Sequence, residues 1–287
     1  MAANKISLWN RLPQTRIKML IARFLYALTV LLWHKKTGII KRHGIRYKID
    51  LNEAVGLSLF LFGNYQKHII KNKSIKLSPR SIIFDVGANF GVFSLQFAKL
   101  VPSGKVYAFE PTHYAFSKLE KNLQLNPKLK KRIFPIQAFV SSKTAANSKL
   151  KAFSSWRIDR YEKMDVHPVH HGIKKPAQGV GSVTLDDFCK KRNITNVDFI
   201  KIDTDGHELK VLYGAKKLIN RFRPIIIFEA GIYLLNEQNI DFAEYMKFFA
   251  PFNYRLFNAQ NGKIINIDNY LRHIPLYGTI DILAVPA

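Results

Sequence analysis

Glycines and carboxylates between residues 82 and 110 are spaced in a way that suits a nucleoside. The apolar run Ile82–Phe84 leads into Asp85 and a turn that holds Gly87 and Gly91, and Glu110 ends the next apolar run, 19 residues after Gly91. Glycines at a strand-to-helix turn let a ligand lie against the backbone. A carboxylate at the end of the next strand can accept hydrogen bonds from two ribose hydroxyls. The spacing predicts a nucleoside-binding βαβ unit.

The glycine spacing also distinguishes between two kinds of nucleoside cofactor. A dinucleotide fingerprint, G-x-G-x-x-G, lets backbone N–H groups approach a pyrophosphate. This chain instead has Asp85-x-Gly87-x-Asn89-x-Gly91, and its acidic residue would repel a pyrophosphate. S-adenosylmethionine has an adenosine, no phosphate, and an ammonium that Asp85 could bind directly or through water. The residues therefore favour S-adenosylmethionine over NAD, and an ordinary tight turn of an α/β domain is the structural alternative.

A second group of titratable residues follows two later apolar runs. Residues 201–208 read KIDTDGHE, and Glu229 ends the apolar run 225–228. Ligands in open α/β sheets bind at the edge where the carboxyl ends of the strands meet. A turn that needed only a helix cap would use Asp205 alone. We therefore expect the side chains of this group to face one cleft.

Metal binding is an alternative use of the same carboxylates. Asp203, Asp205 and Glu229 are hard oxygen ligands of the kind that Mg²⁺ takes. Three histidines gather in a loop-like stretch, where a basic lid or plain surface is the simpler interpretation: His167, His170 and His171. Cys189 is the only cysteine, which excludes an intrachain disulfide and a cysteine-based zinc site. We predict a site without metal.

The charge of the chain indicates anionic partners. The 287 residues include 45 Lys and Arg against 20 Asp and Glu, which gives a net charge of +25 and a pI near 10.1. Such a charge attracts nucleic acid, an anionic membrane leaflet or an acidic glycan. The apolar content of 47% fits one globular domain with an N-terminal extension.

The N-terminal segment 1–36 has two interpretations. Residues 17–33 are mostly apolar, but the charge-free run 24–33 is too short to span a bilayer. Basic residues follow at 34–36 in place of a signal-peptide cleavage site. The segment is either a helix packed on the domain's own core or a basic helix that contacts an anionic membrane. Its apolar stripe consists of Leu20, Phe24, Ala27 and Leu31.

Hydrophobic periodicity predicts the order of the elements. A hairpin over 39–42 and 45–49 turns at His43-Gly44, and a helix covers 53–75. Alternating apolar strands and amphipathic helices then indicate a mostly parallel sheet covered on both faces. We expect strands at 82–86, 105–110, 133–140, 197–203, 225–229, 255–258 and 280–285, and helices at 91–100, 113–125, 185–192, 207–220 and 242–249. The irregular stretch 141–182 is a candidate lid. We divide the chain into an N-terminal part, 1–78, and a catalytic domain, 79–287.

Together these motifs resemble the FkbM-type S-adenosylmethionine-dependent methyltransferases. The match runs from about Ser81 to Gly231. Its blocks are DVGANFG at 85–91, YAFEP at 107–111, LDDF at 185–188, KIDTDGHE at 201–208 with VLYGA at 211–215, and Arg223-Pro224 before Glu229. The more common family form has Val-Glu-Gly-Ala-Glu where this chain has TDGHE at 204–208. The cofactor residues that the resemblance implies are Asp85, Gly87, Ala88, Asn89, Gly91, Glu110, Pro111 and Asp203.

The resemblance implies a class I methyltransferase fold, which is an α/β, Rossmann-like, seven-stranded and mostly parallel sheet. It also implies O-methylation of a glycan, a lipid-linked sugar or another small natural product. A hydroxyl acceptor must lose a proton, and the candidate bases are His207, then Asp205 and Glu229. Two alternatives stay open: a nucleic-acid methyltransferase, and a non-enzymatic basic protein that binds membrane or nucleic acid. We expect a cytoplasmic location, with a candidate contact to the inner membrane face.

Overall fold

The computed structural model describes residues 14–148, 152–153, 158 and 174–287. His167, His170 and His171 lie outside these residues, as does most of the candidate lid. No helix in the described part of the chain combines the length and the apolar character needed to cross a bilayer.

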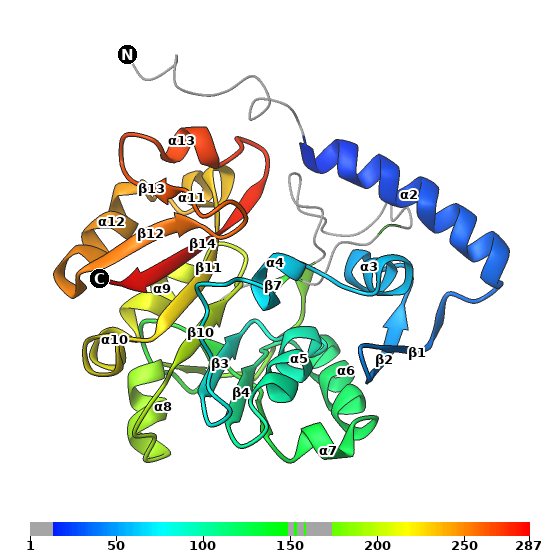
Figure 1. Cartoon of the computed structure of the whole chain (residues 1–287), viewed down its shortest axis with the longest axis horizontal. Coiled ribbons are helices and arrows are strands. Elements are labelled where there is room, and N and C mark those ends of the chain that lie inside the picture. The colour runs from blue at the N-terminus through cyan, green and yellow to red at the C-terminus, as the bar shows by residue number, and fades with distance from the viewer. Residues whose placement is uncertain (1–13, 149–151, 154–157, 159–173) are drawn as a thin grey trace.

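The centre of the molecule is an eight-stranded sheet in the order β13-β12-β14-β11-β10-β3-β4-β5 (Figure 1). Its strands are β3 (Ile82–Val86), β4 (Lys105–Phe109), β5 (Ile133–Ile136), β10 (Phe199–Ile202), β11 (Ile225–Gly231), β12 (Tyr254–Asn258), β13 (Ile264–Ile265) and β14 (Thr279–Pro286). The strands β5, β4, β3, β10 and β11 run parallel, whereas β14 is antiparallel to β11 and β12. The seven predicted strands are present, and the two-residue β13 adds an eighth at the edge. The class I methyltransferase fold is confirmed.

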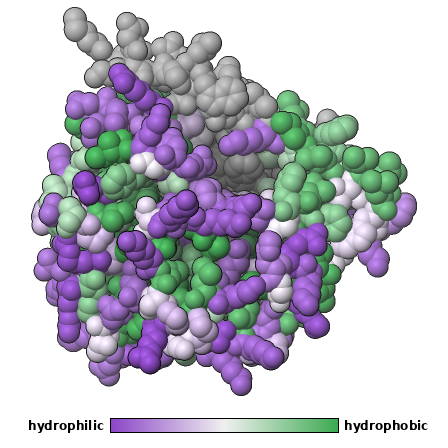
Figure 2. All heavy atoms as spheres, in the orientation of Figure 1, coloured by the Kyte–Doolittle hydropathy of each residue, from purple (hydrophilic) through white to green (hydrophobic). Residues whose placement is uncertain are grey.

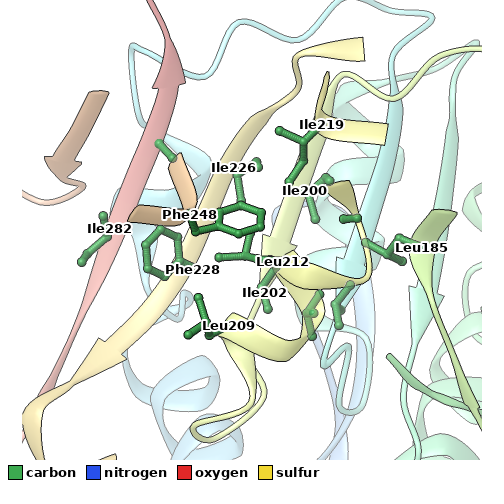
Figure 3. Close-up of a cluster of buried hydrophobic side chains, with 14 of the residues drawn as sticks. Leu185, Ile200, Ile202, Leu209, Leu212, Ile219, Ile226, Phe228, Phe248 and Ile282 are labelled. Atoms are coloured by element: carbon green, nitrogen blue, oxygen red, sulfur yellow. The ribbon is translucent and has the colours of Figure 1, made fainter. Parts of the chain in front are cut away.

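Helices cover both faces of the sheet because neighbouring strand residues point to opposite sides. Phe84, Ile200 and Phe228 pack on one side, with residues of α8 to α12. Figure 3 shows Ile200 and Phe228 in this cluster. Ile83 and Phe199 pack on the other side, with residues of α5 and α6. The helices after β3 are α5 (Val92–Leu100), α6 (His113–Gln124), α7 (Pro127–Lys130), α8 (Leu185–Lys191), α9 (Glu208–Tyr213), α10 (Lys216–Phe222), α11 (Ile232–Glu237), α12 (Ala243–Phe249) and α13 (Tyr270–His273).

The N-terminal elements belong to the second of these cores. They are α2 (Gln14–Trp33), the hairpin β1 (Thr37–Arg42) and β2 (Ile45–Asp50), α3 (Ala54–Phe62) and α4 (Lys67–Ile70). The predicted hairpin is confirmed, and its two-residue turn has positive φ at His43 and Gly44, as a type I′ turn requires. Ile45, Tyr47 and Ile49 are buried in one cluster with the sheet.

Three predicted elements differ in extent from those observed. The predicted helix 53–75 is wrong in extent: it ends at Phe62, where Gly63 has a φ of 70°, and resumes as α4. The predicted helix 207–220 is two helices. Gly214 lies so close to Ser141 that a Cβ would be 2.1 Å from its carbonyl oxygen, and Asp186 accepts the backbone N–H groups of Lys217 and Leu218 at the start of α10.

The predicted strand 133–140 is also wrong in extent. It leaves the sheet after Ile136, and β6 (Phe139–Val140) pairs in parallel with β9 (Ser182–Val183). Pro135 lies on the edge strand β5, where a proline costs no ladder hydrogen bond. A further two-stranded pair joins β7 (Ala152–Phe153) to β8 (Lys174–Lys175) within the predicted irregular stretch.

Candidate functional site

The glycine turn after β3 is held against two neighbouring strand ends. Gly87 has a φ of 79°, and a Cβ there would lie 1.8 Å from the carbonyl oxygen of Asp203, just after β10. The backbone N–H groups of Gly87 and Ala88 both donate to the carbonyl of Phe109 at 2.9 Å, at the end of β4. A side chain at Gly87 would therefore separate the turn from β10.

Glu110 is fixed beside this turn. Its Oε2 accepts the backbone N–H of Asn89 at 3.0 Å, and its Oε1 accepts the N–H and hydroxyl of Thr112 at 2.9 and 2.6 Å. Desolvation raises the pKa of this buried carboxyl, although the hydrogen bonds from Thr112 and Asn89 oppose that shift. An ionised carboxylate accepts about four hydrogen bonds, so capacity remains for a hydroxyl of a ligand.

Asp85, which the sequence suggested as a direct or water-mediated partner of a ligand ammonium, is fully buried outside the lining of the cavity described below. Ser94 donates its hydroxyl to Asp85 Oδ2 at 2.5 Å, and Oδ1 has no hydrogen-bond partner but lies 3.8 Å from Lys201 Nζ. Desolvation raises the pKa of Asp85, and the Lys201 ammonium opposes that shift. In this geometry Asp85 positions Lys201, and a direct contact with a ligand ammonium is not available to it.

Lys201 connects Asp85 to the cavity. It is 2% exposed, and its ammonium bonds Asp203 Oδ2 at 3.1 Å. Desolvation lowers the pKa of Lys201, but Asp203 and Asp85 more than offset this, so the pKa is raised overall. Lys201 is therefore a buried cation between two carboxylates.

A single cavity of about 390 Å³ joins the glycine turn to the carboxyl ends of β10, β11 and β14. Nine of the eleven predicted site residues line it: Gly87, Ala88, Asn89, Glu110, Pro111, Asp203, Asp205, His207 and Glu229. Asp85 is buried and does not line the cavity. Gly91 instead packs its Cα on Leu119, where a Cβ would lie 2.5 Å from the leucine methyl.

Four further carboxyl groups gather in one part of the cavity, which we call the acidic end. Asp203, Asp205, Glu229 and Asp281 all line it. Glu229 Oε1 accepts the hydroxyl of Thr279 at 2.6 Å. Desolvation raises the pKa values of Glu229 and Asp205 well above their usual range, and the charge of Asp203 raises both further. This end suits a positively charged ligand group.

Asp205 is free for the cavity because another residue satisfies the turn. Glu208 is buried, and its Oε1 accepts the N–H groups of Thr204 and Gly206 at 2.9 and 3.2 Å. Asp205 itself has a φ of 51°, and His207 occupies the N-cap position of α9. The alternative in which Asp205 serves only as the helix cap is therefore not observed. Glu208, the first residue of α9, instead holds the preceding turn 204–206 through its side chain.

A pair of residues that no sequence motif indicated, His68 and Asp281, lies at the acidic end. His68 Nε2 lies 2.6 Å from Asp281 Oδ2, and both residues line the cavity. Asp281 pairs with Glu229 across β14 and β11. A carboxylate within the apolar strand 280–284 was the available signal, whereas nothing local marks His68 on the short helix α4.

His207 lies on the same cavity, with its Nδ1 3.3 Å from the ammonium of Lys210. A lysine ammonium can only donate, so Nδ1 is an acceptor in this contact and the remaining ring proton is on Nε2. Among the described residues, no group of three or more His, Cys, Asp and Glu side chains is arranged to hold a metal ion.

Comparisons with known proteins identify relatives of this chain. A family model described as the methyltransferase FkbM domain matches residues 85–256, more than half of the chain. Methyltransferase 1 of Beauveria bassiana is 26% identical over 166 residues, methyltransferase sdnD of Sordaria araneosa 29% over 161, and the 2-O-methyltransferase NoeI of Sinorhizobium fredii 24% over 177. These matches cover 52, 48 and 53% of this chain and 65, 61 and 64% of those proteins, respectively, which is less than two thirds of each relative.

Among solved structures, the FkbM methyltransferase of Methylobacillus flagellatus superposes with a TM-score of 0.43 at 17% identity. The superposition covers 72% of this chain and 44% of that one.

Proposed function

Because the chain belongs to the FkbM methyltransferase family, we propose that it transfers a methyl group from S-adenosylmethionine to a hydroxyl. The proposed acceptor is a glycan, a lipid-linked sugar or another small natural product. The observation that carries the proposal is the cavity, which joins the glycine turn and Glu110 to a cluster of carboxylates and His68. The naming of one relative as a 2-O-methyltransferase supports oxygen as the acceptor atom.

The residues present fit the cofactor. Gly87 has no side chain where the turn approaches Asp203, and Glu110 keeps acceptor capacity for ribose hydroxyls. The Asp203 carboxylate would hold its cationic end, and the bound cation would in turn favour the ionised form of Asp205, whose pKa is raised in its absence. When bound, S-adenosylmethionine supplies an electrophilic methyl group on a sulfonium. The chain's own contribution is to hold the acceptor oxygen in line with that methyl, which is worth roughly 7 to 11 kcal/mol in favourable cases.

The acceptor hydroxyl also needs a group that takes its proton, and we propose His68. Asp281 fixes the ring through Nε2 and stabilises the imidazolium that forms. In that arrangement Nε2–H donates to Asp281 and Nδ1 takes the proton. His207 is less suited, because the Lys210 ammonium occupies its Nδ1 and disfavours a second positive charge. Asp205 and Glu229 remain candidates, and their raised pKa values favour the protonated form.

Calorimetric titration of the full chain with S-adenosylmethionine and its demethylated product tests the cofactor. We expect both to bind, and Glu110→Gln to weaken binding by at least about tenfold, because one charge-assisted hydrogen bond is worth about 1.5–3 kcal/mol. Glu120→Gln, on the exposed surface of α6, is the matched control and should bind as the parent does. No binding by a folded parent chain would refute the proposal.

Labelled methyl donor then identifies the acceptor class. We expect incorporation into hydroxyl-bearing glycans or lipid-linked sugars and none into RNA. The net charge of +25 is the feature that favours a nucleic-acid acceptor, so an RNA panel belongs in the same assay. Incorporation into RNA alone would replace the proposed acceptor while leaving the methyltransferase activity intact.

A further inference from the structure

Helix α2 is apolar on two sides, and the described residues of the domain bury only one of them. Met19 and Thr29 are buried on the inner side, and Leu25 and Trp33 pack there on the core shared with the sheet. The outer side exposes large apolar residues over 45–72% of their surface: Leu20, Ile21, Phe24, Leu28, Leu31 and Leu32. At 100° per residue these six fall within an arc of about 120°. They include three of the four stripe residues predicted from the sequence, and Ala27, the fourth, is exposed as well.

The exposed side of α2 continues onto its neighbours. The Trp33 ring packs on Phe60 of α3 with 4.6 Å between centroids. Arg42 of β1 donates to the carbonyls of Leu59 and Phe60. These contacts place the exposed residues Ile39, Leu61 and Phe62 beside the end of α2. We call the exposed apolar residues of α2, β1 and α3 the apolar face, and Figure 2 shows it as a green area at the right of the molecule.

Basic residues surround the apolar face. The first 49 residues contain eleven Lys and Arg and no Asp or Glu. Five of these cations are exposed next to or on the same elements as the face: Lys18, Arg23, Lys35, Lys36 and Lys41. On β1, Ile39 and Lys41 are both exposed, as alternate residues of one strand face. An apolar centre with a rim of one charge needs a partner that is apolar inside and anionic outside.

We propose that the apolar face docks on an anionic lipid bilayer, with α2 lying in the plane of the interface. Amphipathic helices of this composition insert roughly 5–10 Å into the headgroup boundary, and anionic lipids add attraction to each nearby Lys or Arg. A second copy of the chain is a poorer partner, because it would bring two basic rims together without an acid between them. The proposal concerns binding alone and holds whether or not the chain transfers methyl groups.

Docking would also place the cavity near the lipid. Lys18 belongs to α2 and lines the cavity together with Glu229 and Asp281. A docked helix therefore keeps one edge of the cavity close to the headgroups. The closeness of the cavity to the headgroups favours a lipid-linked acceptor over a freely soluble one. This inference about the acceptor rests on the proposed function, whereas the docking itself does not.

Vesicle sedimentation of the full chain tests the docking. We expect binding to vesicles of phosphatidylcholine with phosphatidylglycerol and at least about tenfold weaker binding to phosphatidylcholine alone, since each Lys or Arg near an anionic surface contributes about 1 kcal/mol. Phe24→Glu with Leu31→Glu should reduce binding to the anionic vesicles by at least about tenfold. Ile264→Glu with Ile267→Glu is the matched control: both isoleucines are about half exposed, in and after β13, and binding should stay within about twofold.

Two double variants that remove lysines test the contribution of the basic rim apart from that of the apolar centre. Lys35→Ser with Lys36→Ser should weaken binding by about fivefold or more per lysine, whereas Lys190→Ser with Lys191→Ser, on the exposed end of α8, should not. Far-UV circular dichroism confirms that each variant is folded. Equal vesicle binding by the parent and Phe24→Glu/Leu31→Glu would overturn the proposal. So would a dimer in solution that this double variant dissociates, in the absence of vesicle binding, because the apolar face would then bind a second copy.

Discussion

His68 and Asp281 are 213 residues apart in the sequence, and the fold brings their side chains to 2.6 Å. One is on a four-residue helix and the other on the antiparallel strand β14. The pair resembles the base and orienting acid of a catalytic triad in its geometry, because the carboxylate fixes the tautomer of the ring. Sequence spacing could not have joined them, since no local pattern connects α4 to β14.

If His68 takes the acceptor proton, His68→Ala will lower kcat with little change in the KM for S-adenosylmethionine. General base catalysis is worth roughly 10²- to 10⁴-fold, and we expect a loss in that range. His207→Ala, which removes a ring already engaged by Lys210, should stay within about threefold in kcat. Steady-state rates of both variants check this, and partial rescue of His68→Ala by added imidazole would distinguish a base from a structural role. A kcat for His68→Ala equal to that of the parent would exclude His68.

Glu229 gives a prediction about pH. Its pKa is raised in the folded state above the ordinary 4.5 by desolvation and by Asp203 and Asp205, so the folded chain binds more protons than the unfolded chain. The stability from this group is complete below about pH 4.5 and is lost as the pH rises through the raised pKa. Between pH 5 and pH 8 the parent should therefore lose stability relative to Glu229→Gln, by at most about 1.4 kcal/mol per pH unit.

Urea unfolding of the parent and Glu229→Gln at several pH values measures this difference. Glu120→Gln, exposed on α6, should follow the parent at every pH. A constant difference between the parent and Glu229→Gln across this range would show that Glu229 titrates normally.

At the scale of elements, the sequence predicted where strands and helices lie better than where they end. The sheet and the hairpin follow from apolar runs and from a two-residue turn that tolerates positive φ at His43 and Gly44. The ends depend on packing between distant segments. The split between α9 and α10 needs Ser141 against Gly214, and β6 leaves the sheet to pair with β9. Such contacts are invisible to a local pattern.

The same limit applies to the site. Nine predicted residues line the cavity because motifs at the carboxyl ends of neighbouring strands must meet. Asp85 was expected beside the ligand, yet it lies beneath the turn because the buried Lys201 and Ser94 hold it there. Whether Asp85 reaches the cavity depends on how deeply its side chain is buried, and the spacing of residues in the sequence does not specify that depth.

The contact between the glycine turn and the end of β10 can be tested with two matched glycines. Gly87 and Gly179 have nearly the same φ, 79° and 77°, but a Cβ on Gly87 meets the Asp203 carbonyl oxygen and a Cβ on Gly179 meets nothing within 4 Å. Gly179→Ala should cost about 1 kcal/mol in the free energy of unfolding from backbone strain alone. Gly87→Ala should cost roughly 3 kcal/mol or more, because two strand ends must separate. Denaturant unfolding compares them, and equal losses would mean that the contact relaxes without cost.

On the scale of the whole molecule, the charges are segregated. Among the described residues, those that line the cavity include five of the chain's 20 acids and only two of its 45 Lys and Arg, in a chain of net charge +25. Acidic groups are therefore concentrated in the cavity, whereas the rest of the chain is strongly basic. This segregation is consistent with the proposed cationic cofactor in the cavity and with the proposed anionic lipid at the surface.

The excess of positive charge should also weaken the fold at low salt. Lys and Arg outnumber Asp and Glu by 25, and like charges on a compact surface repel one another. Added salt screens exposed charges, with a Debye length that falls from about 30 Å at 0.01 M to about 8 Å at 0.15 M. We expect the free energy of unfolding to rise by about 1 kcal/mol or more over that range, which corresponds to a Tm increase of a few degrees. Thermal unfolding in sodium chloride measures the rise, and sucrose at equal osmolality controls for solvent exclusion. If stability instead falls with salt, the ion pairs of the chain, such as Lys118 with Glu53, outweigh the repulsion among its other cations.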